Sequence, residues 1–354
     1  MEDVQDDQVD ISQGTLPSSI YIPPSIHRPP LLLGRSYAHY SPCPVAITPS
    51  PSTDSIPSPS VSLIEPTQCI LGVDEAGRGP VLGPMVYSAF YLPLPLHRSL
   101  LAEEHQFNDS KVLTPGVRSN LMRLLCSPGH PLQKSCGWAV KVLSAQDISA
   151  GMQRPGAAMY NLNAQAMDAT VEIIRGIVEE RGVDVKEVYI DTIGNPQTYQ
   201  KKLERIFPSL KITVAKKADA LFPCVSAASV CAKVTRDAAL EVCYEELRKE
   251  RAGMDGMEHM NDGWGSGYPS DSKCVTWLKK EMHPLFGWGN ECRFSWGTAK
   301  ELLEVKAGLK VDWPTDEDEE AKLMSQFFIA TSTENHEAQD ELRDWYGRRP
   351  KEIF

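Results

Sequence analysis

An alternation of strand-like and helix-like segments between residues 187 and 251 restricts the fold more than any other feature of this chain. The segments 187–191 and 211–219 are rich in β-branched and aromatic residues, and helical stretches follow them at 196–207 and roughly 224–251. Two strands joined through a helix lie parallel in one sheet. The alternation therefore predicts an α/β fold in which helices pack against the sheet.

The sequence predicts three more strands nearer the N-terminus, at 69–74, 81–92 and 135–144. Short links between these strands favour antiparallel pairing. A long amphipathic helix is expected from residue 157 to about residue 181, and another at 270–282 with Ser270 as its N-cap. Together with the parallel unit, this pattern predicts a mixed sheet flanked by helices.

The two ends of the chain differ from its middle in composition. Residues 1–65 hold 11 of the 27 prolines and show no lasting periodicity, which predicts a disordered tail. Most of the formal net charge of −11 comes from the ends, with −5 in residues 1–65 and −7 in residues 301–354, whereas residues 66–300 carry +1. A near-neutral middle can carry a basic groove, so the overall acidity does not exclude a nucleic-acid partner. We therefore predict a catalytic domain at 66–300 between the tail and an acidic C-terminal extension.

Cysteine usage and hydropathy narrow the class of protein. The nine cysteines include no C-x-x-C pair, which favours a reducing intracellular compartment over a disulfide framework and argues against a structural zinc site. The most apolar stretch, 80–96, is interrupted by four prolines, and no run of eighteen apolar residues occurs. A membrane span is therefore not expected.

Acidic residues follow three of the expected strands. Asp74 and Glu75 end the first strand, Asp191 ends the strand at 187–191, and Asp219 follows the next one. The carboxyl ends of parallel strands gather ligands at one edge of a sheet. Carboxylates there suit Mg²⁺ or Mn²⁺, and two such ions can support phosphodiester hydrolysis. The alternative is that each acid only caps a strand end or forms a turn.

A glycine-rich loop, Gly77-Arg78-Gly79, comes directly after the first acidic pair. Its glycines either permit a turn with positive φ or let main-chain amides approach a ligand closely, with Arg78 placed near phosphate. The spacing matches neither a P-loop nor a dinucleotide-binding fingerprint. Main-chain contacts to a sugar hydroxyl would distinguish RNA from DNA, because only RNA carries the 2′-OH.

A second glycine-rich loop, at 263–271, carries two aromatic residues. Trp264 or Tyr268 could stack on a sugar or a base. Packing beneath the loop is an equal alternative for Trp264, whereas Tyr268 lies between Gly267 and Pro269 and is expected to point outward. The sequence thus indicates a substrate-contacting role for Tyr268 in particular.

Several segments occur in a fixed order between residues 68 and 300, and together they carry a resemblance. They read GVDEAGRGPVLGP, NDSKVLT, YNLN, YIDTIG, KKADALFPCVSAASVCAKVTRD, GSGYPSD and RFSWGTA. This set resembles the type 2 ribonuclease H (ribonuclease HII) family, and more narrowly the catalytic chains of its eukaryotic members. The resemblance implies a ribonuclease H-like fold with a helical C-terminal region. It also implies a nuclear, Mg²⁺- or Mn²⁺-dependent endoribonuclease that cleaves RNA–DNA hybrids and single ribonucleotides embedded in duplex DNA, during replication and ribonucleotide removal.

The resemblance assigns roles residue by residue. The catalytic and metal-binding acids are expected to be Asp74, Glu75, Asp191 and Asp219. Gly77, Arg78 and Gly79 are expected at the 2′-OH of the ribonucleotide, and Tyr268 at the next deoxyribose. The residues expected to hold backbone phosphates are Lys111, Asn161 and Arg236.

The family also implies two accessory subunits, held largely through the C-terminal region. Here an apolar cluster, Leu323 with 327–329, follows the acidic stretch 315–320. This cluster either contacts a partner or docks on the catalytic domain. Two other functions stay open from the residues alone. One is a non-catalytic nucleic-acid-binding protein, and the other is a nuclease of the same fold that cuts DNA.

Overall fold

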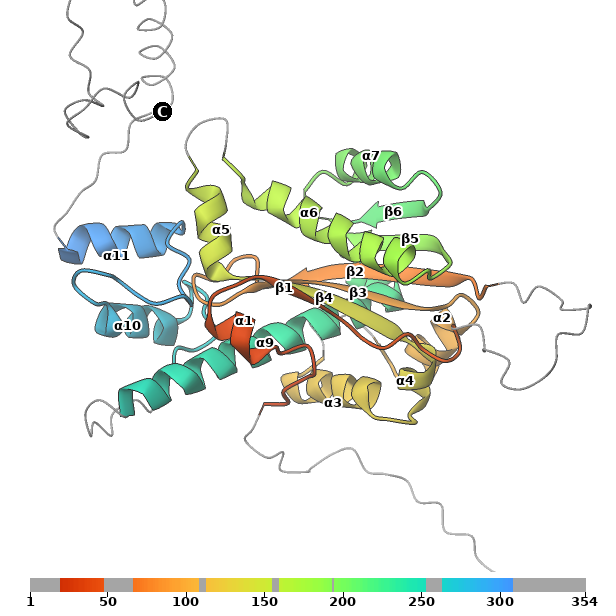
Figure 1. The fold of residues 1–354 in the computed structure, drawn as a ribbon, viewed down its shortest axis with the longest axis horizontal. Helices are drawn as coiled ribbons and strands as arrows, with labels where there is room; N and C mark the ends of the chain where they lie inside the picture. The colour runs from red at the N-terminus through yellow and green to blue at the C-terminus, as the bar shows by residue number, and fades with distance from the viewer. Residues whose placement is uncertain are drawn as a thin grey trace, which may run out of the picture. The chain divides into compact units, whose positions relative to one another are not determined.

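The computed structural model describes residues 20–47, 66–107, 113–154, 159–192, 194–252 and 263–307. These residues contain a six-stranded sheet with the order β1-β4-β3-β2-β5-β6 (Figure 1). The strands are β1 (Tyr37–Tyr40), β2 (Cys69–Ala76), β3 (Met85–Pro93), β4 (Gly137–Leu143), β5 (Val185–Asp191) and β6 (Lys211–Ala215).

The sheet is mixed, as the sequence predicts. β2, β3 and β4 pair antiparallel in chain order, and β1 adds antiparallel to β4. β5 lies parallel to both β2 and β6. The central strand β2 therefore joins the antiparallel half to the parallel half, and its acidic end lies beside the end of β5.

Helices cover both faces of this sheet (Figure 1). One face carries α6 (Leu162–Arg175), continued by the π-helical turn η3 (Gly176–Glu180), and α7 (Pro196–Ile206). The other face carries α9 (Pro223–Ala252) and α3 (Pro115–Cys126). The remaining helical elements are α1 (Arg28–Leu32), α2 (Leu96–Arg98), η1 (Ser99–Glu104), α4 (Pro131–Ser135), α5 (Ala145–Met152), α8 (Ala218–Leu221), α10 (Ser272–Glu281) and α11 (Gly297–Ala307).

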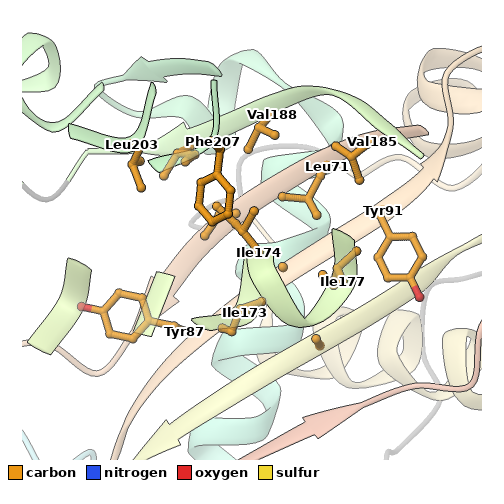
Figure 2. Packing of buried hydrophobic residues seen from close by; sticks show 14 of the residues in the cluster. Leu71, Tyr87, Tyr91, Ile173, Ile174, Ile177, Val185, Val188, Leu203 and Phe207 are labelled. Carbon is orange, nitrogen blue, oxygen red and sulfur yellow. The ribbon is translucent and has the colours of Figure 1, made fainter. Parts of the chain in front are cut away.

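Side-chain alternation along β2 divides the core into two layers. Leu71 packs with Ile173 and Ile174 of α6, as Figure 2 shows, whereas Ile70 packs in the layer that contains α9. Gly72 allows α9 to approach the sheet, because a β-carbon at this position would lie 2.3 Å from the carbonyl carbon of Cys224. The N-terminal half of α9 is thereby held directly behind the acidic end of β2.

Part of the expected N-terminal tail is structured, which corrects the prediction of disorder for residues 1–65. Within the described residues 20–47, α1 packs near α9 and β1 extends the sheet. Ser25 and Thr235 share a buried hydrogen bond of 2.9 Å, and a β-carbon at Gly176 would come 2.1 Å from the hydroxyl of Tyr40. Proline-rich composition suggested disorder, but these contacts lie more than 130 residues away in sequence and cannot be read locally.

Two smaller expectations also differ from the structure. The N-cap of α10 is Asp271, whose side chain accepts from the main-chain N–H of Lys273, and not Ser270. α11 begins at Gly297 and so crosses the expected boundary between residues 300 and 301. The rest of the predicted extension, including the apolar cluster at 323–329, lies outside the described residues. Among those that are described, no helix is both long and apolar enough to span a membrane.

Candidate active site

Two of the four predicted acids meet at the ends of neighbouring parallel strands. The register of β2 and β5 pairs Val73 with Ile190, so the next residues, Asp74 and Asp191, lie side by side. Asp74 is only 5% exposed, and its Oδ1 accepts a 2.7 Å hydrogen bond from the main-chain N–H of Glu75. Both carboxylates are therefore placed by the sheet itself.

Asp219 comes from the first turn of a short helix and not from the end of a strand, as the sequence suggested. β6 ends at Ala215, Lys217 adopts a left-handed φ of 56°, and α8 then begins. The main-chain N–H of Ala218 donates to Oδ1 of Asp191 at 3.0 Å. This bond ties the start of α8 to the end of β5 and brings the buried Asp219 to the same edge of the sheet.

The acids influence one another electrostatically. Burial is the main cause that raises the pKa of both Asp74 and Glu75, and repulsion from Asp191 and Asp219 raises each further. A hydrogen bond from Ser229 of α9 opposes this effect at Asp74 and lowers its pKa. The four carboxylates are therefore close enough to act as one interacting group, in surroundings that disfavour their full ionisation.

The donor set suits hard divalent cations. In the described part of the chain, no three acidic, histidine or cysteine side chains stand close enough to form a complete metal site by themselves. All four carboxylates nevertheless supply oxygen ligands, which Mg²⁺ and Mn²⁺ prefer, and Mg²⁺ keeps several of its waters. A cation here would also offset the repulsion and burial that raise the pKa of Asp74 and Glu75.

The loop Gly77-Arg78-Gly79 lies against Tyr268, so the structure brings together two separately predicted substrate-binding elements. Gly77 has a φ of 82°, and a β-carbon there would lie 2.7 Å from the carbonyl oxygen of Pro84. A β-carbon at Gly79 would lie 3.3 Å from Cε1 of Tyr268. Tyr268 stays 38% exposed, so its ring forms an accessible wall beside the loop.

Arg78 and Asn161 meet at the N-terminus of α6. The Arg78 guanidinium donates to the side-chain oxygen of Asn163. Asn161 is the N-cap of α6, and its Oδ1 accepts from the main-chain N–H groups of Asn163 and Ala164, each at 3.0 Å. Its side-chain oxygen is thus engaged in capping, which leaves its NH₂ group to donate. Lys111 lies outside the described residues.

Arg236 differs most from its expected position. Only 7% of it is exposed, although the sequence predicts a phosphate contact. Its Nη1 pairs with Asp237 at 3.0 Å, its Nη2 donates to the carbonyl oxygen of Ser266, and its guanidinium lies 5.4 Å from the centre of the Tyr268 ring. Arg236 therefore holds the loop that carries Tyr268.

Trp264 takes the packing alternative that the sequence left open. It is 3% exposed, and its ring lies 5.3 Å from that of Tyr244 and 5.2 Å from that of Trp277. Of the two aromatic residues in this loop, only Tyr268 is therefore available to a substrate.

Sequence reasoning missed four residues that shape the site. Ser229 contacts Asp74, Asn163 receives Arg78, and Arg293 and Trp296 bind the carbonyls of the 77–79 loop. The segment RFSWGTA contributed to the resemblance but carried no signal for what its arginine and tryptophan contact. More than 210 residues separate these two side chains from the loop they hold.

Comparison with known proteins agrees with this architecture. The family model for Ribonuclease HII matches residues 71–299. The A chain of the ribonuclease H2 complex of Neurospora crassa is 54% identical over 92% of this chain and 94% of its own length, and the human counterpart of the same name is 43% identical over 72% and 78%. The crystal structure of ribonuclease H2 from Pyrococcus horikoshii OT3 superposes with a TM-score of 0.51 at 27% identity, covering 67% of this chain and 98% of that one. The chain therefore belongs to the ribonuclease HII family, and with it to the ribonucleases H, which are nucleases of mixed α/β fold.

Proposed function

We propose that this chain is an endoribonuclease that hydrolyses the RNA strand of RNA–DNA hybrids and incises 5′ of single ribonucleotides embedded in duplex DNA. One observation supports this most directly, namely the contact between Gly79 and Tyr268 immediately beyond the acidic edge. A ribose held by the 77–79 loop would lie within reach of both the carboxylates and the aromatic ring. Such an arrangement suits an enzyme that tests for a 2′-OH and for the sugar that follows it.

Each part of the site has a distinct task in this proposal. Asp74, Glu75, Asp191 and Asp219 would hold two Mg²⁺ or Mn²⁺ ions, which when bound activate water and stabilise the leaving oxygen, giving 5′-phosphomonoester products. The main chain of the 77–79 loop contacts the 2′-OH, while Arg78 and Asn161 face the phosphates on either side. The ring of Tyr268 packs on the following deoxyribose. Arg236 supports that ring from behind, and we expect Lys111 to hold a phosphate.

We further propose that the chain is the catalytic member of a heterotrimer. The relatives are each named as one lettered subunit of ribonuclease H2, which implies other subunits in those proteins. Two accessory subunits would bind through the C-terminal region, and the complex would act in the nucleus, removing ribonucleotides from DNA and RNA primers during replication. Loss of co-purification after truncation at residue 307, with both accessory subunits retained by the full chain, would support this assembly.

The activity is tested with a DNA duplex that contains one ribonucleotide. Incision 5′ of that ribonucleotide in Mg²⁺, and its loss in Asp74→Asn, is the expected result. Equal cleavage of an all-DNA duplex would indicate a deoxyribonuclease of the same fold. Hybrid binding without any turnover, with accessory subunits present, would indicate a non-catalytic binding protein.

A further inference from the structure

Arg293 is a fully buried arginine whose three guanidinium nitrogens all bind main-chain carbonyls of one loop. Nη2 donates to Gly77 at 2.6 Å, Nη1 to Arg78 at 3.2 Å, and Nε to Gly83 at 3.0 Å. None of the solvent-exposed surface belongs to this side chain. Burying a guanidinium costs free energy, and here burial is also the main cause that lowers its pKa. The donor fork is therefore committed to holding the segment 77–83.

Trp296 completes the set of contacts. Its indole Nε1–H donates to the carbonyl oxygen of Gly79 at 3.0 Å, and its ring lies 4.8 Å from the Arg293 guanidinium. The carbonyls of Gly77, Arg78 and Gly79 are thus bound in succession by two side chains that lie three residues apart. The stacking between those two side chains makes them one unit.

Main-chain pairing fixes this unit in register with the loop. The N–H of Arg293 donates to the carbonyl of Val81 at 2.8 Å, and the N–H of Gly83 donates to the carbonyl of Glu291 at 2.7 Å. Leu82 and Cys292 form an antiparallel bridge between the same segments. The loop cannot slide along residues 291–296 without breaking these bonds.

The direction of the carbonyls determines the direction of the amides. The peptide bonds of the loop are trans, so the N–H of each residue points away from the carbonyl of the residue before it. Because the carbonyls of Gly77 and Arg78 point at Arg293, the N–H groups of Arg78 and Gly79 point the opposite way. The third peptide has no N–H, since residue 80 is proline. The loop therefore presents two donors, and its carbonyls are not offered as acceptors.

We infer that Arg293 and Trp296 are positioning residues for sugar recognition, which aim the amides of Arg78 and Gly79 at the 2′-oxygen of the substrate. This inference rests on the proposed function and adds a specific direction to it. The 2′-oxygen is recognised as an acceptor of main-chain hydrogen bonds, and the C-terminal segment 291–296 sets the geometry of that recognition. Neither side chain needs to touch the nucleic acid.

The test compares Trp296→Phe with Trp288→Phe in the full chain, with accessory subunits if the wild type requires them. Trp296→Phe keeps an aromatic ring under Arg293 and removes only the bond to Gly79. Trp288→Phe is the matched control, because its indole Nε1–H donates to the carbonyl of Leu278 at 2.9 Å, in the same part of the chain but away from the loop. Single-turnover cleavage is measured on duplexes whose one modified nucleotide carries either a 2′-OH or a 2′-fluoro group, which accepts hydrogen bonds poorly.

We expect Trp296→Phe to cleave the 2′-OH substrate about fivefold more slowly, the equivalent of one lost hydrogen bond. Its penalty for 2′-fluoro should shrink by about the same factor, while Trp288→Phe should keep the wild-type penalty. Arg293→Lys, which retains the charge but not the three-pronged donor, should reduce the penalty further. Thermal unfolding of all three variants checks that they are folded.

A wild-type 2′-fluoro penalty in both Trp296→Phe and Arg293→Lys would overturn the inference, even if their overall rates fell. A reduced penalty in Trp288→Phe would overturn it as well, because a general loss of stability would then explain the effect. Failure of the wild type to incise the 2′-OH duplex would contradict the proposed function instead, so the two failures are distinguishable.

Discussion

The main-chain N–H of Ala218 binds Oδ1 of Asp191 at 3.0 Å, so one carboxylate both belongs to the candidate metal site and anchors the start of α8. The two roles can be separated by substitution. Asparagine keeps an oxygen at the accepting position but has no charge, whereas alanine has neither.

We predict that Asp191→Asn abolishes cleavage and leaves thermal stability near that of the wild type. Asp191→Ala should also be inactive but should lose about 1 kcal/mol of stability, because the bond to Ala218 disappears. Cleavage assays and thermal unfolding of the two variants measure this difference. Equal stability of the two would mean that the bond contributes nothing to holding α8.

We predict that the charge of Asp74 destabilises the protein when no metal ion is present. The folded state raises the pKa of Asp74 and Glu75, so it holds their protons to higher pH than the unfolded chain does. Stability should therefore fall as pH rises from the usual carboxyl range through the raised pKa values. In EDTA at pH 8, Asp74→Asn should raise the unfolding midpoint, by about 2–4 °C for each 1 kcal/mol of penalty removed.

Added Mg²⁺ or Mn²⁺ should stabilise the wild type more at pH 8 than at pH 5, and Asp74→Asn less than the wild type at either pH. Differential scanning fluorimetry across this pH range follows both effects. A midpoint that is lower in Asp74→Asn than in the wild type at pH 8 would show that the carboxylate stabilises the fold.

Ser229 should set the acidic limb of the pH–rate profile. Its hydrogen bond lowers the pKa of Asp74, so Ser229→Ala should raise that pKa and shift the acidic limb to higher pH. Ser25→Ala is the control, because it removes the buried hydroxyl bond to Thr235 on the same helix, among residues distant from the acids. The profile of kcat/KM against pH should move in the first variant and not in the second.

Tyr268 should matter most where RNA meets DNA. Tyr268→Ala should slow cleavage at a single embedded ribonucleotide by more than it slows cleavage within a long RNA–DNA hybrid, because the ring is expected to sense the deoxyribose that follows. Steady-state kinetics on both substrates provides the measurement. An equal loss on both would count against junction sensing.

Arg236 should act through Tyr268 and not through phosphate. It is buried and bonded to Asp237 and Ser266 beneath the Tyr268 ring. We predict that Arg236→Lys reproduces the substrate preference of Tyr268→Ala and leaves the salt dependence of binding unchanged. A phosphate contact would instead reduce the slope of log K against log salt by about 1 when it is lost. A reduced slope would restore the role expected from the sequence.

The sequence predicted the sheet well because periodicity and strand-ending acids are local signals. β2 to β6, α6, α7 and α9 all fall within the expected segments, and the antiparallel and parallel pairings are confirmed. β1 escaped prediction because its stability comes from pairing with β4, about 100 residues away, in a stretch whose prolines suggest disorder. Composition describes the unpaired chain and not the surface that receives it.

The candidate site was predictable by residue type but not by contact. Asp74 and Asp191 could be placed from strand order, whereas the position of Asp219 depends on a left-handed Lys217 that no pattern announces. Arg293 resembles any arginine in sequence, and its role depends on a loop more than 200 residues away. Long-range hydrogen bonds of this kind leave no periodic trace.

The most direct test of the account is incision of a DNA duplex containing one ribonucleotide, measured in Mg²⁺ for the wild type and for Asp74→Asn. The account predicts a single cut 5′ of the ribonucleotide by the wild type, none by Asp74→Asn, and none in the matching all-DNA duplex. Undiminished cutting by Asp74→Asn, or equal cutting of the all-DNA duplex, would contradict it.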